Sequence, residues 1–298
     1  MSENQTLGFI GLGVMGVPMC RNLAEKSNEP VVAYDIRQEP IVALAEHGVD
    51  NGESIAGVAA TADIIFLSLP GEPQVRAVCL EPGGVLEHCR EGQTVVDTSS
   101  VPPGLSRELA EAFARHGVDF ADAPVARTRQ AAHDGTLAIT VGGSDHVVAR
   151  IRPYLECMGT EITHCGEVGA GEVLKLMNNM IVMEIVNAIG EALAIGRRAG
   201  VDGQLLFETL AKGSADSFVL RSHGLKHMVP GDFPEQAFPV TYALKDLTYA
   251  LALADELGVD AAGAKHVKEL LEQAIEAGYS EQYYPVIQKI IDPDSAAA

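Results

Sequence analysis

The chain has 298 residues, and its 41 acidic and 21 Lys or Arg side chains give a formal net charge of −20. A hydrophobic content of 47% excludes a disordered polyelectrolyte. The shortage of cations argues against nucleic acid or an anionic membrane as a partner, because both need clustered Lys and Arg. An anionic substrate would have to find local positive charge.

Several other features narrow the class of protein. The first residues show no basic stretch followed by an apolar core, so we expect no secretory signal. The five cysteines form no C-x-x-C pattern and the histidines no zinc-binding spacing, which favours a reducing cytoplasm and no metal site. The most apolar stretch, residues 173–195, is interrupted by charged and amide side chains, and we expect it not to span a membrane.

The first half of the chain alternates short β-branched runs with stretches of helical spacing. We expect a strand at residues 6–10, a helix from about 14 to 24, and further strands at 31–34, 64–69, 94–96, 118–120, 137–141 and 161–164. Continuous apolar strands that alternate with helices are typical of an α/β domain, with a mostly parallel sheet covered on both faces.

The second half is predicted to be helical throughout. A long helix is expected from about residue 171 to 198, followed by three more segments at helical spacing around 201–213, 245–258 and 266–278. No strand-like run follows about residue 168. We therefore predict two domains, 1–167 with the sheet and 168–298 all-α.

A glycine motif opens the first helix. Gly11, Gly13 and Gly16 fit G-x-G-x-x-G directly after an apolar strand, with Leu12, Val14 and Met15 between them. In a dinucleotide site the first Gly allows a tight turn, the second lets the backbone approach the pyrophosphate, and the third packs the helix on the sheet. The alternative is a Gly-rich turn with no ligand. The position between strand and helix favours the dinucleotide site.

Asp35 ends the next predicted strand, 19 residues after Gly16. An acidic residue there accepts hydrogen bonds from the ribose hydroxyls and repels a 2′-phosphate, which favours NAD over NADP. Arg37 could soften this preference, or it could be an ordinary surface Arg. We predict NAD with some tolerance for NADP.

The long helix begins with polar residues on an otherwise apolar segment. Lys175, Asn178, Asn179 and Val182 are spaced i, i+3, i+4 and i+7, so they share one face. A buried Lys or Asn needs partners or a solvent cavity, which would indicate a site. The alternative is that this face points to water or to another subunit, and the spacing does not decide between the two.

Six segments in this order resemble the β-hydroxyacid dehydrogenase family: residues 8–23, 97–100, 122–125, 135–137, 169–179 and 245–247. The family includes 3-hydroxyisobutyrate dehydrogenases, tartronate semialdehyde reductases and sulfolactaldehyde reductases. The resemblance implies a Rossmann-type N-terminal domain, an all-α C-terminal domain as in 6-phosphogluconate dehydrogenase, and an active site in the cleft between them. It also implies a homodimer or homotetramer and a small hydroxy-acid or aldehyde-acid substrate.

The resemblance also assigns roles. Lys175 is expected to be the catalytic acid/base, and Asn179 to hold the substrate and orient this Lys. Asn178 is expected to contact the substrate, and Val182 disfavours the decarboxylating reaction of 6-phosphogluconate dehydrogenases. Lys175 also disfavours an imine reductase, since those enzymes usually lack the Lys.

Two further groups of residues follow from the resemblance. Ser99 and Ser100 are expected to bind a substrate carboxylate, although Ser is also ordinary turn chemistry before two prolines. Leu69, Ser100 and Lys245 are expected to contact the cofactor.

The chain departs from most of the family after Pro124 and Val125. Ala126, Arg127 and Thr128 replace a usual Ser-Gly-Gly, and sulfolactaldehyde reductases have a similar Arg. We predict that Arg127 and Thr128 bind substrate, with the guanidinium reading a distal anion. The alternative is that Arg127 or Arg129 pairs with Asp122 or Asp134 and does not contact the substrate.

The sequence as a whole predicts an NAD-dependent β-hydroxyacid dehydrogenase that interconverts a short hydroxy acid and its semialdehyde. A sulfolactaldehyde reductase-like enzyme is the first alternative, and a non-catalytic dinucleotide-binding module is the second. Arg127, Lys175 and Lys245 are expected to make the cleft locally positive despite the charge of −20.

Overall fold

The structure is a computed structural model that describes residues 5–235 and 237–293. The chain divides into two compact units, Met1–Lys175 and Leu176–Ala298. The predicted boundary between residues 167 and 168 lies eight residues before this division.

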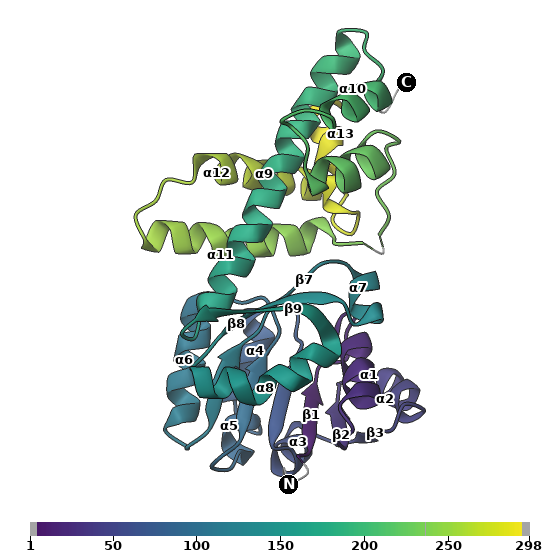
Figure 1. The fold of residues 1–298 in the computed structure, drawn as a ribbon. Coiled ribbons are helices and arrows are strands. Elements are labelled where there is room, and N and C mark those ends of the chain that lie inside the picture. Colours follow the sequence, from purple (N-terminus) through teal and green to yellow (C-terminus); the bar gives the residue numbers. More distant parts are fainter. Residues whose placement is uncertain (1–4, 236, 294–298) are drawn as a thin grey trace. The chain divides into compact units, whose positions relative to one another are not determined.

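The first unit contains a nine-stranded sheet (Figure 1). Its strands are β1 (Leu7–Ile10), β2 (Val31–Tyr34), β3 (Val49–Asn51), β4 (Ile64–Leu67), β5 (Thr94–Asp97), β6 (Asp119–Asp122), β7 (Val125–Ala126), β8 (Leu137–Gly142) and β9 (Gly159–Gly166). The strand order is β3-β2-β1-β4-β5-β6-β8-β7, and β9 also pairs with β8.

The sheet is mostly parallel, as predicted. All pairs from β3 to β6 are parallel, and so is β8 with β9. The exceptions are the antiparallel pairs that β8 makes with β6 and with β7. Because β1 lies between β2 and β4, the strand order reverses beside it, and a Rossmann-type sheet binds its ligand at such a switch point.

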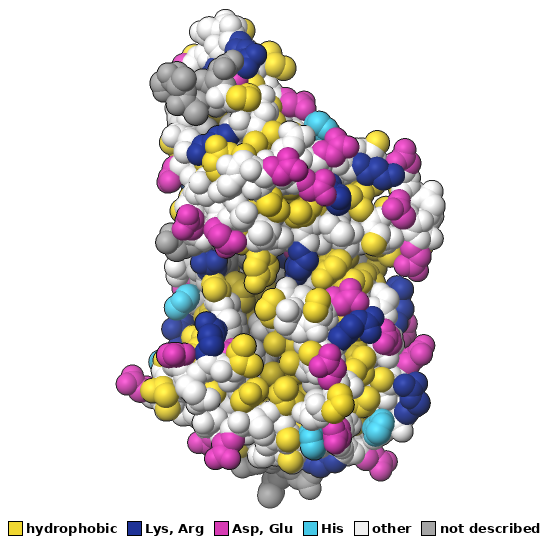
Figure 2. Space-filling view, turned by 180° about the vertical axis from the view of Figure 1, so that it is seen from behind, with side chains coloured by type: hydrophobic (Ala, Val, Ile, Leu, Met, Phe, Trp, Pro, Cys, Tyr) yellow, Lys and Arg dark blue, Asp and Glu magenta, His cyan; other side chains and the backbone are white. Residues whose placement is uncertain are grey.

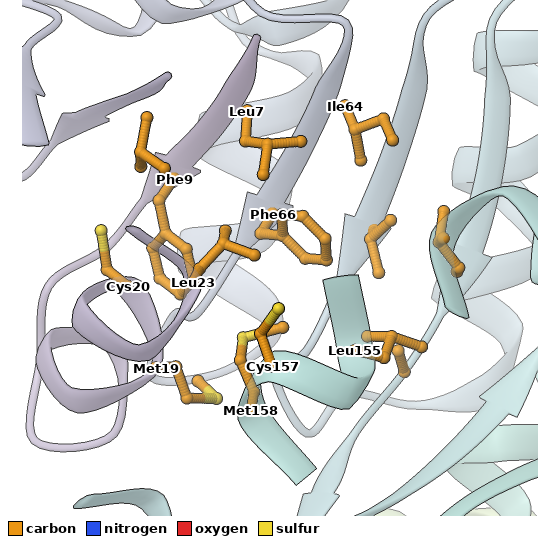
Figure 3. Close-up of a cluster of buried hydrophobic side chains, with 14 of the residues drawn as sticks. Leu7, Phe9, Met19, Cys20, Leu23, Ile64, Phe66, Leu155, Cys157 and Met158 are labelled. Carbon is orange, nitrogen blue, oxygen red and sulfur yellow. The ribbon is translucent and has the colours of Figure 1, made fainter. Parts of the chain in front are cut away.

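Helices cover both faces of this sheet. They are α1 (Gly16–Lys26), α2 (Gln38–Ala45), α3 (Ile55–Thr61), α4 (Glu72–Leu80), α5 (Val85–His88), α6 (Pro103–Ala114), α7 (Arg129–Asp134) and α8 (Asp145–Met158). Side chains of α1, α2, α7 and α8 pack in one core, and those of α3 to α6 pack in another. In the first core, the rings of Phe9 and Phe66 stack with centroids 6.2 Å apart, next to Met19 and Leu23 of α1 (Figure 3).

The second unit is helical, as predicted. Its elements are α9 (Ala170–Arg198), which begins in the first unit, α10 (Gly203–Leu210), a π-helix η1 (Leu220–Met228), α11 (Val240–Glu256), α12 (Ala262–Glu276), a 3-10 helix η2 (Tyr284–Ile287) and α13 (Gln288–Ile291). Between residues 176 and 293, leaving out residue 236, the only β pairing is an isolated bridge between Pro239 and Tyr283. The hydrophobic core of the second unit contains Met183, Val186 and Leu193 of α9.

Helix α9 is long and apolar enough to cross a membrane by length and composition, with a mean hydropathy of 1.4 over its most apolar window. We expected no span here because polar residues interrupt the segment. The same composition suits a helix that carries part of a protein core, and α9 contributes buried side chains to the core of the second unit.

Charged side chains of both signs are interspersed on the face shown in Figure 2, where Lys and Arg lie among Asp and Glu. On this face the acidic side chains are dispersed and do not form one patch.

Candidate active site

The glycine loop between β1 and α1 depends on two of its three glycines for packing. Gly11 has a φ of 96°, and a Cβ there would lie 2.3 Å from the carbonyl oxygen of Ser68. A Cβ on Gly16 would lie 2.0 Å from the carbonyl oxygen of Gly11. Neither position can accept a side chain, so the turn and the start of α1 require Gly.

Gly13 is different, since a Cβ there would meet no atom within 4 Å. The packing of the chain therefore gives no reason for Gly at this position, whereas close approach of a pyrophosphate does. The side chain of Leu12 is buried in the core, Met15 packs against that core, and Val14 is exposed. The loop thus offers open backbone at the N-terminus of α1, which fits a dinucleotide phosphate.

Asp35 is fixed beside this loop. Its Oδ2 accepts a hydrogen bond from the backbone N–H of Leu12 at 2.6 Å, and its Oδ1 accepts from the backbone N–H of Arg37 at 2.8 Å. The guanidinium of Arg37 also binds Asp35, at 3.2 Å from Nε, and donates to the carbonyl oxygen of Leu12 at 2.9 Å. Arg37 is therefore paired with Asp35, which offsets the charge that would repel a 2′-phosphate.

Ser99 connects the segments that follow β4 and β5 by a hydrogen bond. Its hydroxyl accepts a hydrogen bond from the backbone N–H of Leu69 at 2.9 Å, and its own N–H donates to Asp97 Oδ1 at 2.9 Å. Ser99 is buried and Ser100 is half-buried. The Ser99 hydroxyl thus has a structural partner, and Ser100 is the more accessible of the two.

The segment that departs from the family pattern forms β7 and the short helix α7. Arg127 has a φ of 85°, the left-handed region that suits the Gly expected there in relatives. Its Nη1 donates to the carbonyl oxygen of Thr136 at 2.6 Å and to Thr160 Oγ1 at 3.2 Å. The Thr128 hydroxyl caps α7 by accepting from the N–H of Ala131 at 3.3 Å. Arg127 thus ties this segment to the sheet.

Helix α1 holds the other end of α7. Asn22 is buried, and its Nδ2 donates to the carbonyl oxygens of Pro18 at 2.9 Å and Ala132 at 2.8 Å. Arg21 Nη2 donates to the carbonyl oxygen of His133 at 2.7 Å. The helix that follows the glycine loop therefore also positions the segment around Arg127.

Lys175 lies in the second turn of α9 and is half-buried. The beginning of this helix is bound by Asp122, whose Oδ1 accepts from the N–H of Gly169 at 2.6 Å and whose Oδ2 accepts from the N–H of Glu172 at 2.8 Å. Burial raises the pKa of Asp122 to about 6, although hydrogen bonds from the backbone act in the opposite direction.

In the second unit, Asn179 belongs to a polar network between α9 and α11. Its Nδ2 donates to Asp246 Oδ2 at 2.7 Å, and Lys245 Nζ lies 3.2 Å from Asp246 Oδ1. Asn178 is exposed and donates to Asn179 Oδ1 at 3.0 Å. The buried carboxylate of Asp246 thus fixes the amide nitrogen of Asn179, while the amide oxygen accepts from Asn178.

Lys245 is held on its own helix as well. Its Nζ lies 5.6 Å from the centre of the Tyr242 ring and 5.5 Å from that of Tyr249, which are cation–π distances. Among the residues that the structure describes, no group of three or more His, Cys, Asp or Glu side chains is placed to hold a metal ion.

Two carboxylates that hold the elements of this candidate site had no clear signal in the sequence. In the sequence, Asp122 stands out only as a motif residue and as an alternative partner of Arg127, and Asp246 only as the residue after Lys245 that is expected to orient this segment. Their partners are distant in the chain, 47 residues away for Gly169 and 67 for Asn179. An Asp at the end of a buried strand would have been the one local hint for Asp122.

Two family models together match most of the chain. Residues 6–166 match the family model described as the NAD binding domain of 6-phosphogluconate dehydrogenase. Residues 169–287 match the one described as NAD-binding of NADP-dependent 3-hydroxyisobutyrate dehydrogenase.

Individual relatives agree. The 2-(hydroxymethyl)glutarate dehydrogenase of Eubacterium barkeri is 37% identical over 86% of this chain and 84% of its own. The 2-hydroxy-3-oxopropionate reductase of Escherichia coli K12 is 34% identical over 92% of this chain and 93% of its own. The chain belongs to the β-hydroxyacid dehydrogenase family.

A solved structure of another member, the 3-hydroxyisobutyrate dehydrogenase of Mycobacterium tuberculosis with L-serine, has the same fold. Its TM-score is 0.89 at 28% identity, over 97% of this chain and 100% of that one. This β-hydroxyacid dehydrogenase is accordingly an NAD(P)-dependent oxidoreductase that acts on hydroxyl groups. NAD is its cofactor, with NADP as an alternative, and the open backbone at Gly13 and the carboxylate of Asp35 fit this cofactor.

Proposed function

We propose that this β-hydroxyacid dehydrogenase interconverts an acid of the form HOOC–CH(R)–CH₂OH and the aldehyde HOOC–CH(R)–CHO. The named compounds of the three relatives above share this skeleton. R is methyl in 3-hydroxyisobutyrate, carboxyethyl in 2-(hydroxymethyl)glutarate, hydroxyl in 2-hydroxy-3-oxopropionate and amino in L-serine. The constant part is a carboxylate next to the carbon that carries the reacting group.

The residues of the chain divide the chemistry between them. The cofactor, when bound, supplies or takes the hydride. Lys175 transfers the proton: its ammonium protonates the alkoxide that develops on reduction, and its neutral amine removes the hydroxyl proton on oxidation. Asn179, fixed by Asp246, directs its amide oxygen to hold the substrate hydroxyl. Ser100 and Asn178 supply accessible polar groups for the carboxylate.

The observation that supports this division best is the polar face of α9. Lys175 and Asn179 are one helical turn apart on it, and Asn179 is oriented by a buried carboxylate. A helix that only contributed to a core would not need a fixed amide beside a Lys. The same observation disfavours a non-catalytic dinucleotide-binding module, which has no use for a proton donor.

The test is Lys175→Ala, assayed with NADH and an aldehyde HOOC–CH(R)–CHO for each of the four R groups named above. We expect kcat to fall by about 10²–10⁴-fold, because a general acid–base group contributes that much. Lys268→Ala, which removes a surface Lys paired with Glu272 on α12, should leave kcat unchanged. A kcat of Lys175→Ala within about tenfold of wild type would remove Lys175 from proton transfer.

Arg127 favours an R group that carries an anion. The first of these relatives acts on a compound with a second carboxylate, and Arg127 is exposed on the segment where the chain departs from the Ser-Gly-Gly pattern. Thr128 next to it could donate a hydrogen bond to the same anion. A sulfonate would suit the same guanidinium, so a sulfolactaldehyde reductase-like activity is the second candidate.

We infer further that the protein is a cytoplasmic homodimer or homotetramer. Ile181, Ala188 and Ile195 form an exposed apolar stripe at seven-residue spacing on α9, and 53% of Ile181 and 69% of Ile195 is exposed. A second copy that covers this stripe would remove apolar area from water. Light scattering that gives the monomer mass of 31.5 kDa would contradict this assembly.

A further inference from the structure

The first turn of α9 is attached to the sheet of the first unit by a buried carboxylate. The first N–H groups of any helix lack acceptors within the helix and need partners elsewhere. Here Asp122, at the end of β6, accepts from the N–H of Gly169 at 2.6 Å and from the N–H of Glu172 at 2.8 Å. Asp122 is fully buried, so both oxygens are committed to the helix end.

A second strand fixes the same turn. Thr140 of β8 donates from Oγ1 to the carbonyl oxygen of Gly171 at 3.1 Å. A Cβ on Gly171 would lie 2.5 Å from the carbonyl oxygen of Thr140 and 2.8 Å from Asp122 Oδ2. The helix backbone is therefore pressed against β6 and β8 at a point where only Gly fits.

A neutral capping residue would be a simpler partner for the beginning of α9. Ser, Thr or Asn satisfies one N–H group without burying a charge, and burial of a carboxylate is costly. Burial raises the pKa of Asp122 to about 6, which is a sign of that cost. The carboxylate instead accepts two charge-assisted hydrogen bonds on one rigid group. Together they fix the position of the helix along its axis and its rotation about that axis.

We propose that Asp122 is a positioning residue for Lys175. By fixing the first turn of α9, Asp122 determines where the proton-transferring amine lies on the unit that binds the cofactor. Lys175 lies one turn beyond Gly171 on α9, and that turn is fixed by Asp122 and Thr140. A shift of about 1 Å in a reacting group costs roughly 10²-fold in rate. The two hydrogen bonds at the N-terminus of α9 thus affect the rate through the position of Lys175, and Asp122 itself does not contact the substrate.

This inference rests on the proposed function of Lys175, and a double-mutant cycle separates the two. The variants are Asp122→Asn, Lys175→Ala and the double variant, each assayed for kcat and for the Kd of NADH. Asn keeps one acceptor for Gly169 but places an NH₂ group opposite the N–H of Glu172. We expect Asp122→Asn to lower kcat by about 10–100-fold with a Kd for NADH within about threefold.

In the Lys175→Ala background, the same Asp122→Asn change should lower the remaining kcat by less than about threefold, because the group that it positions is gone. Asp119→Asn is the matched control. It lies at the other end of β6 and pairs with His146 at the surface, and its kcat should equal that of wild type.

Two results would overturn the inference. An unchanged kcat in Asp122→Asn shows that the attachment does not position the amine, and an equal loss in both backgrounds shows that Asp122 acts on something other than Lys175. A Lys175→Ala variant with wild-type kcat refutes the proposed function instead. If Asp122→Asn does not fold by circular dichroism, Thr140→Val takes its place in the same cycle under the same criteria, with an expected loss of about 3–10-fold.

Discussion

His223 is a buried imidazole whose protonation should make the stability of the protein depend on pH. It lies in the π-helix η1 with 8% of its surface exposed, between the rings of Phe218, Tyr283 and Tyr284 at centroid distances of 5.5–6.2 Å. Burial lowers the pKa of His223 to about 4, and the charge of His227 acts in the same direction. In the folded protein it is therefore neutral down to acidic pH.

The sign of the effect follows from the two states. An unfolded His has a pKa near 6.5. Between pH 6.5 and 4 the unfolded chain binds a proton at residue 223 and the folded chain does not, so the free energy of unfolding falls as the pH falls. For pKa values of 6.5 and about 4, the loss between pH 7.5 and 4.5 is about 2–3 kcal/mol.

The perturbation is His223→Phe, which keeps a ring in the aromatic cluster and removes the titration. Among the described residues His223 Nδ1 has no hydrogen-bond partner, so the substitution should cost little at pH 7.5. Urea unfolding followed by far-UV circular dichroism gives the free energy at both pH values, since the chain has no Trp for fluorescence. The variant should lose about 2–3 kcal/mol less than wild type when the pH is lowered from 7.5 to 4.5.

Two comparisons isolate the effect. Asp122 contributes in the opposite direction, because its raised pKa makes the folded state less stable as the pH rises from 4 to 6, but this contribution is the same in both proteins and cancels. His266→Gln removes an imidazole that is 53% exposed and should follow wild type. If His223→Phe loses as much stability as wild type on acidification, the reasoning about His223 is wrong.

The remaining predictions concern the cofactor loop and the substrate. Gly16→Ala should destabilise the first unit by about 3 kcal/mol or more, because its Cβ would lie 2.0 Å from the Gly11 carbonyl oxygen. Gly13→Ala should leave the melting temperature unchanged and raise the Kd of NADH, and equal effects of the two variants on melting would contradict the packing argument. Arg127→Ala should raise KM for 2-(hydroxymethyl)glutarate by about 10–100-fold and leave KM for 3-hydroxyisobutyrate unchanged. A uniform change for both substrates would show that Arg127 only ties its segment to Thr136.

Most of the first unit could be predicted from the sequence because its strands are buried and apolar. The predicted strand at 31–34 agrees with β2 residue for residue, and the strand at 137–141 agrees with β8 to within one residue. Strand β3 was missed since only Val49 of its three residues is buried. β7 was missed because two residues carry no periodicity, and α7 because its six residues are mostly polar and its start depends on the left-handed φ of Arg127.

The candidate site divides in the same way. Gly16 and Asp35 act through neighbours in one βαβ unit, so a local pattern predicts them. The partner of Asn179 lies on α11, and the partner of the first turn of α9 lies on β6. No local pattern connects residues that far apart in the chain. The Ser99 hydroxyl, which stays a predicted substrate contact, accepts a hydrogen bond from the backbone N–H of Leu69, and no local motif indicates this internal contact.

The hydrogen bonds from α1 to α7 bear on how this scaffold can be engineered or can diverge. Asn22 and Arg21 hold the carbonyl oxygens of Ala132 and His133, so a segment transplanted from a relative to change substrate preference must end in the same helical turn. A graft that stops at the variable residues 126–128 preserves that anchorage. One that also replaces α7 and shifts these carbonyl oxygens leaves the buried Asn22 amide with only the Pro18 carbonyl oxygen of its own helix to donate to, and selection would have to change both segments together.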